Sequence, residues 1–338
     1  MSDPKNPSSA SSAPESGSSK DEPEIPHSLA RELDELQSNT VEELEAVAST
    51  ASALIADAVA QAHAERLANP GSAVPQPIAV PFIEFKEVSI AFGDRKILDE
   101  ISFHIGRGQT LCILGRSGVG KSVSLRILLG FLKPDAGKVL VDGEEILDLD
   151  ERGLQEIRKK VTMVFQNGAL FDSLTVGENI AFPLREKGGL EEDQIQQLVS
   201  RMLNLVDQSD TVDRLPSSLS MGQKRCIAIA RALAAQPEAI LYDEPTTMVD
   251  PIMGRNIGDL IQRLKLQLGI TSIVVTHDMR FAERLADLVL FLESGKARFF
   301  GTIQEFMACP DEHVQQFLTL DAYQLPSRPP SPIPSTLG

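Results

Sequence analysis

The chain has 338 residues, of which 42% are hydrophobic and 24% charged, ordinary proportions for a globular protein with a sizeable core. This composition excludes collagen-like, wholly disordered and disulfide-scaffold proteins. The formal net charge of −16 argues against a general nucleic-acid binder, which needs excess lysine and arginine to neutralise phosphates. We therefore expect no nucleic acid among the partners.

Residues 1–81 are interpreted as an acidic extension, because 13 acidic and only 4 basic side chains fall within residues 1–80. Residues 1–26 are rich in Ser, Pro, Asp and Glu and are predicted to be disordered. Apolar residues at spacings of three and four predict an amphipathic helix at about 41–68, and four prolines predict a linker at 69–81. The apolar stripe of that helix could pack on this chain's own domain, on a partner protein or on a membrane surface.

The sequence shows no signal that would send it across or into a membrane. Its first residues lack the apolar core of a secretion signal, and no stretch approaches the ~18 apolar residues of a spanning helix. The three cysteines, Cys112, Cys226 and Cys309, are far apart and lack CxxC spacing, which fits a reducing compartment. We predict a cytoplasmic protein that reaches any membrane through a partner.

From residue 82 onward the pattern is that of an α/β domain. Strand segments are predicted at 83–85, 88–90 and 98–105, with a turn at 92–94. A helix is predicted at 122–131, whereas residues 173–235 are expected to be a mostly helical insertion. Short continuous apolar runs are typical of parallel strands covered on both faces, and they occur at 111–114, 161–165, 239–242, 272–275 and 288–292.

The sharpest local signal is a glycine-rich loop between a predicted strand and a predicted helix, which fits G-x-x-x-x-G-K-[ST]. Glycines let the backbone wrap closely, so that successive N–H groups point at phosphate oxygens. Lys121 is expected to reach the β and γ phosphates, and the Ser122 hydroxyl to bind Mg²⁺. The predicted nucleotide-binding residues of this loop are Gly115, Arg116, Ser117, Gly118, Val119, Gly120, Lys121 and Ser122.

Acidic residues end the apolar run at 239–242, at the sheet edge where ligands bind parallel sheets. Asp243 is suited to hold Mg²⁺, and Glu244 to orient or deprotonate an attacking water. Such a pair could also cap a helix, but its combination with the phosphate loop favours catalysis. His277 follows another predicted strand at the same edge and could hydrogen-bond the γ phosphate.

Together these motifs resemble the ATP-binding cassette ATPases. Gln166 resembles the Q-loop glutamine of that family, residues 219–223 resemble its LSGGQ signature, and residues 247–250 resemble its D-loop. Phe92 is placed like the aromatic residue that stacks on adenine. These elements follow the family's order across residues 82–301.

The resemblance implies an α/β P-loop NTPase fold of the cassette type, with a RecA-like core, an antiparallel β subdomain and a helical subdomain at about 173–235. The ATPase domain would span 82–305, followed by a C-terminal helix and a Pro-rich tail at 306–338. ATP would be the substrate and Mg²⁺ the cofactor. The implied catalytic residues are Glu244, His277 and Gln166, and the implied metal ligands are Ser122, Gln166 and Asp243.

The resemblance also implies a homodimer in which each cassette completes the site of its neighbour. Residues that would contact the ATP held by the second copy are Ser220, Gly222, Gln223 and Asp250. This sequence departs from the family pattern at Met221, which replaces the first glycine of the signature, and at Val249, which replaces a leucine. The methionine could weaken closure of the dimer or slow turnover.

The segment 165–186 has apolar groups suited to a groove for a partner's coupling helix. It is similar to the cassettes of bacterial phospholipid (Mla) and Mce-type transporters, as are residues 250–252 and 314–318. This similarity implies an ATPase that drives lipid transport by an integral membrane permease at the cytoplasmic face of the inner membrane, with a small regulatory subunit as an optional partner. The alternatives are a cassette for amino acids or other small solutes, and a nucleotide-gated scaffold in cell-envelope assembly. Apolar side chains near Phe317 could pack on a second cassette.

Overall fold

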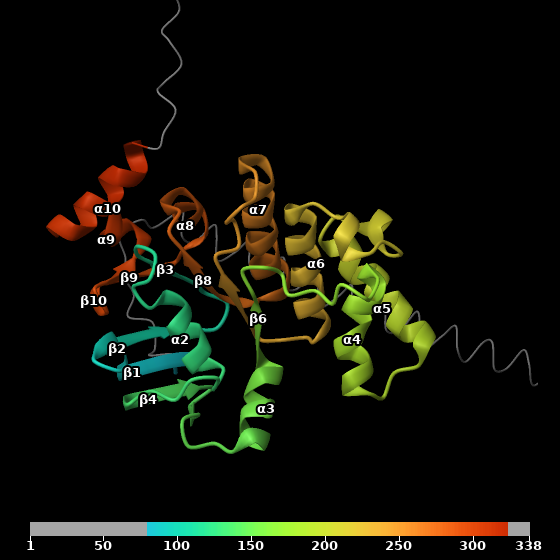
Figure 1. Cartoon of the computed structure of the whole chain (residues 1–338), viewed down its shortest axis with the longest axis horizontal. Helices are drawn as coiled ribbons and strands as arrows, with labels where there is room; N and C mark the ends of the chain where they lie inside the picture. The colour runs from blue at the N-terminus through green and yellow to red at the C-terminus, as the bar shows by residue number, and fades with distance from the viewer. Residues whose placement is uncertain (1–79, 324–338) are drawn as a thin grey trace, which may run out of the picture. The chain divides into compact units, whose positions relative to one another are not determined.

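The computed structural model describes residues 80–323 (Figure 1). The predictions of a disordered segment at 1–26, an amphipathic helix at 41–68 and most of a linker at 69–81 lie outside the described residues, as does the Pro-rich tail. Within the described part, no helix is long and apolar enough to cross a membrane.

Two sheets organise the domain. The first is antiparallel, in the order β2-β1-β4-β5, and consists of β1 (Ile83–Phe92), β2 (Arg95–Ile105), β4 (Ala136–Val141) and β5 (Glu144–Glu145). The second sheet has the order β10-β9-β3-β8-β7-β6, and only its β9–β10 pair is antiparallel. Its strands are β3 (Thr110–Leu114), β6 (Val161–Val164), β7 (Ala239–Asp243), β8 (Thr271–Thr276), β9 (Leu288–Glu293) and β10 (Lys296–Thr302).

The described helices cover this second sheet and extend beyond it. They are α2 (Lys121–Leu128), α3 (Glu151–Lys160), α4 (Val176–Lys187), α5 (Glu192–Leu205), α6 (Met221–Ala234), α7 (Pro251–Leu268), α8 (Met279–Leu285), α9 (Ile303–Met307) and α10 (Glu312–Tyr323). Two short 3₁₀ helices lie between α5 and α6, at Ser209–Thr211 and Pro216–Ser218. Figure 1 shows the antiparallel sheet at lower left and α4, α5 and α6 at right, with the second sheet between them.

The parallel strands of the second sheet are buried on both faces, which is why they appear as continuous apolar runs in the sequence. Alternate residues of β3 enter different cores because successive side chains of a strand point to opposite faces. Cys112 and Leu114 pack in the core beneath α4–α8, while Leu111 and Ile113 pack in the core shared with the antiparallel sheet and α2. All five predicted parallel strands are present in this sheet.

Strand register brings the functional segments to one edge of the sheet. Leu114, the last residue of β3, pairs with Thr276 of β8, and Asp243 of β7 pairs with Val275. The glycine-rich loop, the Asp243–Glu244 pair and His277 therefore leave the sheet at neighbouring positions. Their proximity follows from parallel pairing, since the carboxyl ends of parallel strands share an edge.

The segment expected to be helical, 173–235, contains α4, α5 and α6, which pack on one another. Helix α4 begins with a capping box, in which Thr175 and Glu178 satisfy each other's backbone N–H groups. Its inward-facing apolar residues join those of α6 in one core. The capping box and the inward-facing apolar residues therefore account for the position of α4, whereas the sequence analysis predicted only a mostly helical segment.

Some elements differ from the sequence prediction. Strands β4, β5 and β10 and helix α3 were not expected, because they are short or largely exposed and lack a strong apolar pattern. The helix predicted at 122–131 ends earlier, at Leu128, since Gly130 takes a left-handed conformation with φ 70°. Phe317 of α10, expected to pack on a second cassette, is buried against Phe291 of this chain, with ring centroids 5.0 Å apart.

Candidate active site

The glycine-rich loop joins β3 to α2, and its glycines are required by close contacts. Gly115 has φ 149°, and a Cβ there would lie 2.3 Å from the backbone oxygen of Leu292. Gly120 has φ 105°, and its Cβ would lie 2.7 Å from a methyl group of Leu98. Gly120 is also the N-cap of α2, so no side chain occupies the start of that helix. The positive end of α2 is thus open to an anion such as a phosphate group.

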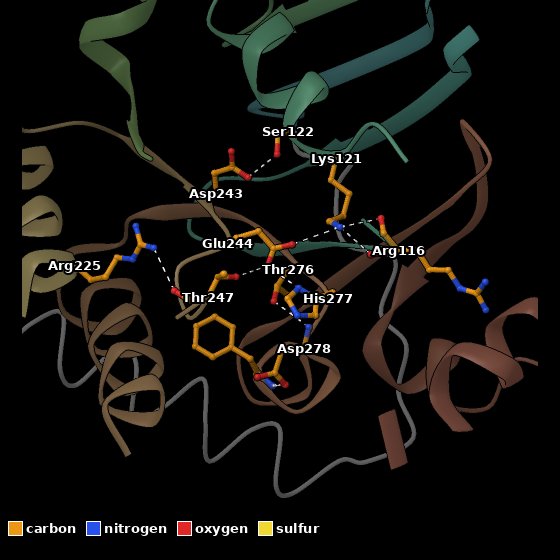
Figure 2. A network of polar contacts seen from close by, with 12 residues as sticks. Arg116, Lys121, Ser122, Arg225, Asp243, Glu244, Thr247, Thr276, His277 and Asp278 are labelled. Atoms are coloured by element: carbon orange, nitrogen blue, oxygen red, sulfur yellow. Dashed lines mark hydrogen bonds and ion pairs between the residues drawn. The ribbon is translucent and has the colours of Figure 1, made fainter. Parts of the chain in front are cut away.

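Lys121 lies at the base of this loop, where hydrogen bonds fix its ammonium group (Figure 2). Its side chain is 6% exposed, and Nζ donates to the backbone oxygens of Gly115 (2.8 Å) and Arg116 (3.1 Å). Nζ also lies 3.5 Å from Oε1 of Glu244. A buried ammonium group needs such partners because burial alone strongly disfavours its charge. Entering phosphate oxygens would compete with Glu244 for Lys121.

Glu244 lies at the centre of the polar network in Figure 2. Its backbone is left-handed, with φ 49°, a conformation that a non-glycine residue adopts only when surrounding contacts stabilise it. Its N–H donates to the backbone oxygen of Val275, which fixes it against β8. The carboxylate Oε2 accepts from the Thr247 hydroxyl at 3.3 Å and lies 2.9 Å from Nδ1 of His277. Glu244 therefore links Lys121, which is predicted to bind phosphate, to His277, which is predicted to be catalytic.

Ser122 and Asp243 meet beside this network and fit a divalent cation. The Ser122 hydroxyl donates to Oδ1 of Asp243 at 2.7 Å. Burial raises the pKa of Asp243, and the hydrogen bond from Ser122 partly opposes that rise. A hydroxyl and a carboxylate are hard oxygen ligands of the kind that Mg²⁺ prefers, and a cation there would offset the buried charge. When bound, Mg²⁺ would neutralise charge on the phosphate groups.

A cleft of about 450 Å³ is lined by eight of the thirteen site residues that were predicted to act on this chain's own nucleotide. The residues that line it are Arg116, Ser117, Gly118, Lys121, Ser122, Gln166, Glu244, Thr247, His277 and Phe317. A neighbouring cleft of about 400 Å³ includes Val119 and shares Arg116, Ser117 and Gly118 with the first. Phe92 lines neither of these two clefts; it lies at the end of β1 and is 51% exposed, so its adenine-stacking role stays a prediction.

The residues predicted to act on a second cassette lie outside that cleft and have structural roles in their own chain. Ser220 and Gln223 form the capping box of α6, with each side chain accepting from the other's backbone N–H. Asp250 caps α7 by accepting from the N–H of Met253 at 2.9 Å. A Cβ on Gly222 would lie 2.2 Å from Cγ of Met253, so this position has no room for a side chain. Their action in trans stays a prediction.

Three residues in or beside the site were given no role there by the sequence analysis, although Thr247 begins the predicted D-loop segment 247–250. Thr247 hydrogen-bonds Glu244, and its place three residues after that acid was the available signal. Phe317 reaches the cleft from α10, and Arg225 donates to a backbone oxygen next to Gln166. No local pattern marks these last two, because both contacts join segments far apart in the chain.

The buried charge of Asp243 leads to a stability prediction for the nucleotide-free protein. The pKa of Asp243 is higher in the folded chain than the ordinary Asp value of about 3.9. The protonated carboxyl group therefore stabilises the fold below that ordinary value, and this stabilisation is lost as the pH rises through the folded-state pKa. At neutral pH the ionised group is therefore a cost, which Asp243→Asn removes while keeping an acceptor for Ser122. We expect Tm at pH 7 to rise by about 2–4 °C. Thermal unfolding from pH 7 to pH 4 should show this advantage shrinking as the pH falls.

The matched control is Asp210→Asn, which changes an exposed aspartate and should leave Tm unchanged at both pH values. A lower Tm for Asp243→Asn at pH 7 would show that the carboxylate stabilises the empty site, contrary to the burial argument.

Comparisons with known proteins agree with this geometry. A family model described as "ABC transporter" matches residues 98–247. MlaF of Haemophilus influenzae, the ATP-binding protein of an intermembrane phospholipid transport system, is 39% identical over 236 residues, which are 70% of this chain and 89% of MlaF. The methionine import ATP-binding protein MetN of Brucella abortus is 38% identical over 242 residues, which are 72% of this chain and 65% of MetN. The match thus spans slightly less than two thirds of the MetN relatives.

Solved structures show the same fold. The dimeric ATP-binding cassette MJ0796 bound to ADP and Pi is 32% identical, with a TM-score of 0.61, over 65% of this chain and 98% of that one. CbiO1 of Clostridium perfringens, part of the ABC transporter complex cbiONQ, is 30% identical, with a TM-score of 0.64, over 72% and 97%. The chain belongs to the ATP-binding cassettes of ABC transporters. Within the described residues, the predicted fold class, an α/β P-loop nucleotide-binding domain of the ABC type, is confirmed.

Proposed function

We propose that this chain powers phospholipid transport as a homodimer docked on an integral membrane permease at the cytoplasmic face of the membrane. The observation that carries the proposal is the share of each relative's length that the match covers. The match extends over 89% of the phospholipid-system relative MlaF but only 65% of MetN, so a third of MetN has no counterpart in the matched region. Identity alone does not separate the two, since it is 39% and 38%.

Three partly exposed phenylalanines of the segment 165–186 support docking on a permease. Phe165, Phe171 and Phe182 each expose more than a third of their surface, and the rings of Phe171 and Phe182 are 4.9 Å apart. Phe165 directly precedes Gln166, which lines the nucleotide cleft. Clustered exposed aromatic rings are typical of protein interfaces, and an apolar helix of the permease would cover them. Movement of Phe165 would reach the site through its peptide bond to Gln166.

The catalytic role that we propose for Glu244 follows from its contacts. Phosphate groups that bind Lys121 would take the place of the Glu244 carboxylate, leaving Glu244 free to orient or deprotonate a water. His277, 2.9 Å from that carboxylate, would then be placed to hydrogen-bond the γ phosphate. Ser122, Asp243 and Gln166 would hold Mg²⁺. Hydrolysis would remove the group that joins the two cassettes, and the dimer would reopen.

Amino-acid import is the second candidate, favoured by the 38% identity with the MetN relatives. A cassette that gates an envelope assembly without transport has no specific observation in its favour. The two transport hypotheses differ in the ligand that should stimulate ATP hydrolysis by the complete complex.

The decisive experiment is to purify the full-length chain with its co-purifying membrane subunit and reconstitute the complex in liposomes. We expect bound phospholipid in the purified complex and ATPase activity that rises with phospholipid but not with added methionine. The complex with Glu244→Gln serves as the control for contaminating ATPases. Stimulation by methionine together with the absence of bound phospholipid would overturn the lipid assignment and favour amino-acid import.

A further inference from the structure

Arg225 is a buried cation of α6 that lies outside the lining of the nucleotide cleft and has been given no role so far. It is 2% exposed, and in the described part of the chain no carboxylate lies within ion-pair distance of it. Its Nε has no hydrogen-bond partner. Burial lowers the pKa of the guanidinium group, and the charge of Asp243 opposes that change. A buried charge without a paired carboxylate is costly, and an apolar residue of similar size would often be as stable.

The hydrogen bonds of Arg225 connect three functional segments. Nη1 donates to the backbone oxygen of Phe165 at 2.8 Å, next to Gln166, and Nη2 lies 3.5 Å from the backbone oxygen of Thr247. Figure 2 shows the guanidinium group reaching from α6 toward Thr247, whose hydroxyl bonds Glu244. The chain of contacts therefore runs from α6, which Ser220 caps, through Arg225 and Thr247 to Glu244.

We propose that Arg225 is a positioning residue that holds Thr247, and through it Glu244, in register with α6 and with the backbone beside Gln166. The inference rests on the catalytic role proposed above for Glu244. Arginine suits this task because its planar, forked donors can satisfy two acceptors on different segments, which a lysine ammonium cannot do with the same geometry. Displacing α6 would then move the carboxylate that acts on water.

The test compares Arg225→Lys with Thr247→Val in the full-length protein. Both variants should lower kcat by about tenfold and change the KM for ATP less than about twofold, because they misplace Glu244 without removing a phosphate contact. The double variant should lower kcat no further than the stronger single variant, since both break one chain of contacts. Additive losses in kcat would show that Arg225 does not act through Thr247.

If Arg225 had only a structural role, its substitution would change Tm and kcat in a different way. Arg263→Lys is the control, because Arg263 also donates to a distant backbone oxygen, that of Leu205 at 2.9 Å, and has a buried Nε without a partner, although its side chain is 39% exposed and pairs with Asp207. We expect Arg263→Lys to lower Tm no more than Arg225→Lys does, and to leave kcat unchanged. A kcat loss in Arg225→Lys that merely follows the unfolded fraction overturns the proposal. Thr247→Val, at a partly exposed site, keeps the test decisive should Arg225→Lys fail to fold, because unchanged kcat in that variant also overturns it.

The Glu244→Gln variant distinguishes failure of the proposed catalytic role of Glu244 from failure of the proposed positioning role of Arg225. Unchanged turnover in Glu244→Gln would remove the catalytic assignment itself. Loss of turnover in Glu244→Gln together with normal kcat in both Arg225→Lys and Thr247→Val would leave that assignment intact and overturn only the role of Arg225.

Discussion

Replacing Glu244 with glutamine should lower the rate of ATP hydrolysis by about 10²–10⁴-fold, the range expected for loss of a general base. The amide can still accept from Thr247, so the local structure should persist. ATP should bind at least as tightly as to the wild type, because Lys121 no longer has a carboxylate 3.5 Å away to compete with phosphate. Phosphate release measures the rate, and titration with a fluorescent nucleotide measures the affinity.

The control for this prediction is Glu283→Gln, which makes the same chemical change on the exposed surface of α8 and should alter neither quantity. Full activity in Glu244→Gln would exclude the carboxylate as the base. Loss of nucleotide binding would instead show that the Lys121–Glu244 pair is needed to keep the loop in its binding conformation.

Mixing two inactive variants should restore about a quarter of wild-type activity if each site is shared between two cassettes. Lys121→Met removes a phosphate contact, and Ser220→Arg blocks the predicted contact with the neighbour's ATP. Half of the randomly formed dimers contain one of each variant, and each such dimer has one intact site out of two. Steady-state ATPase activity of the equimolar mixture measures the recovery.

A mixture of Lys121→Met with Glu244→Gln is the matched control and should stay inactive, because both changes fall on the same side of the site. Ser220→Arg also removes the N-cap of α6, at a cost of about 1 kcal/mol, so each variant is checked by its Tm before mixing. Equal activity in the two mixtures would exclude shared sites.

The sequence predicts the structure best where a motif of functional residues directly follows a regular pattern of apolar residues. The glycine-rich loop could be located because Gly115 and Gly120 have no room for a Cβ, so glycine is required there, and because the apolar run 111–114 precedes the loop. Asp243, Glu244 and His277 could be assigned to one edge because parallel strands end together. Strand β10 was missed, since it is an edge strand with exposed charged residues and no apolar alternation.

The sequence alone determined the class of protein and the chemical groups of its nucleotide site, because both depend on residue types at fixed short spacings. Tertiary structure decided which of those groups touch: Lys121 with Glu244, Glu244 with His277, and Ser122 with Asp243. It also brought Arg225 within 2.8 Å of the backbone oxygen of Phe165, 60 residues away. Because every residue has a backbone oxygen, no residue type in the sequence indicates which one will accept the hydrogen bond. Only the packing of α6 against the end of β6 creates it.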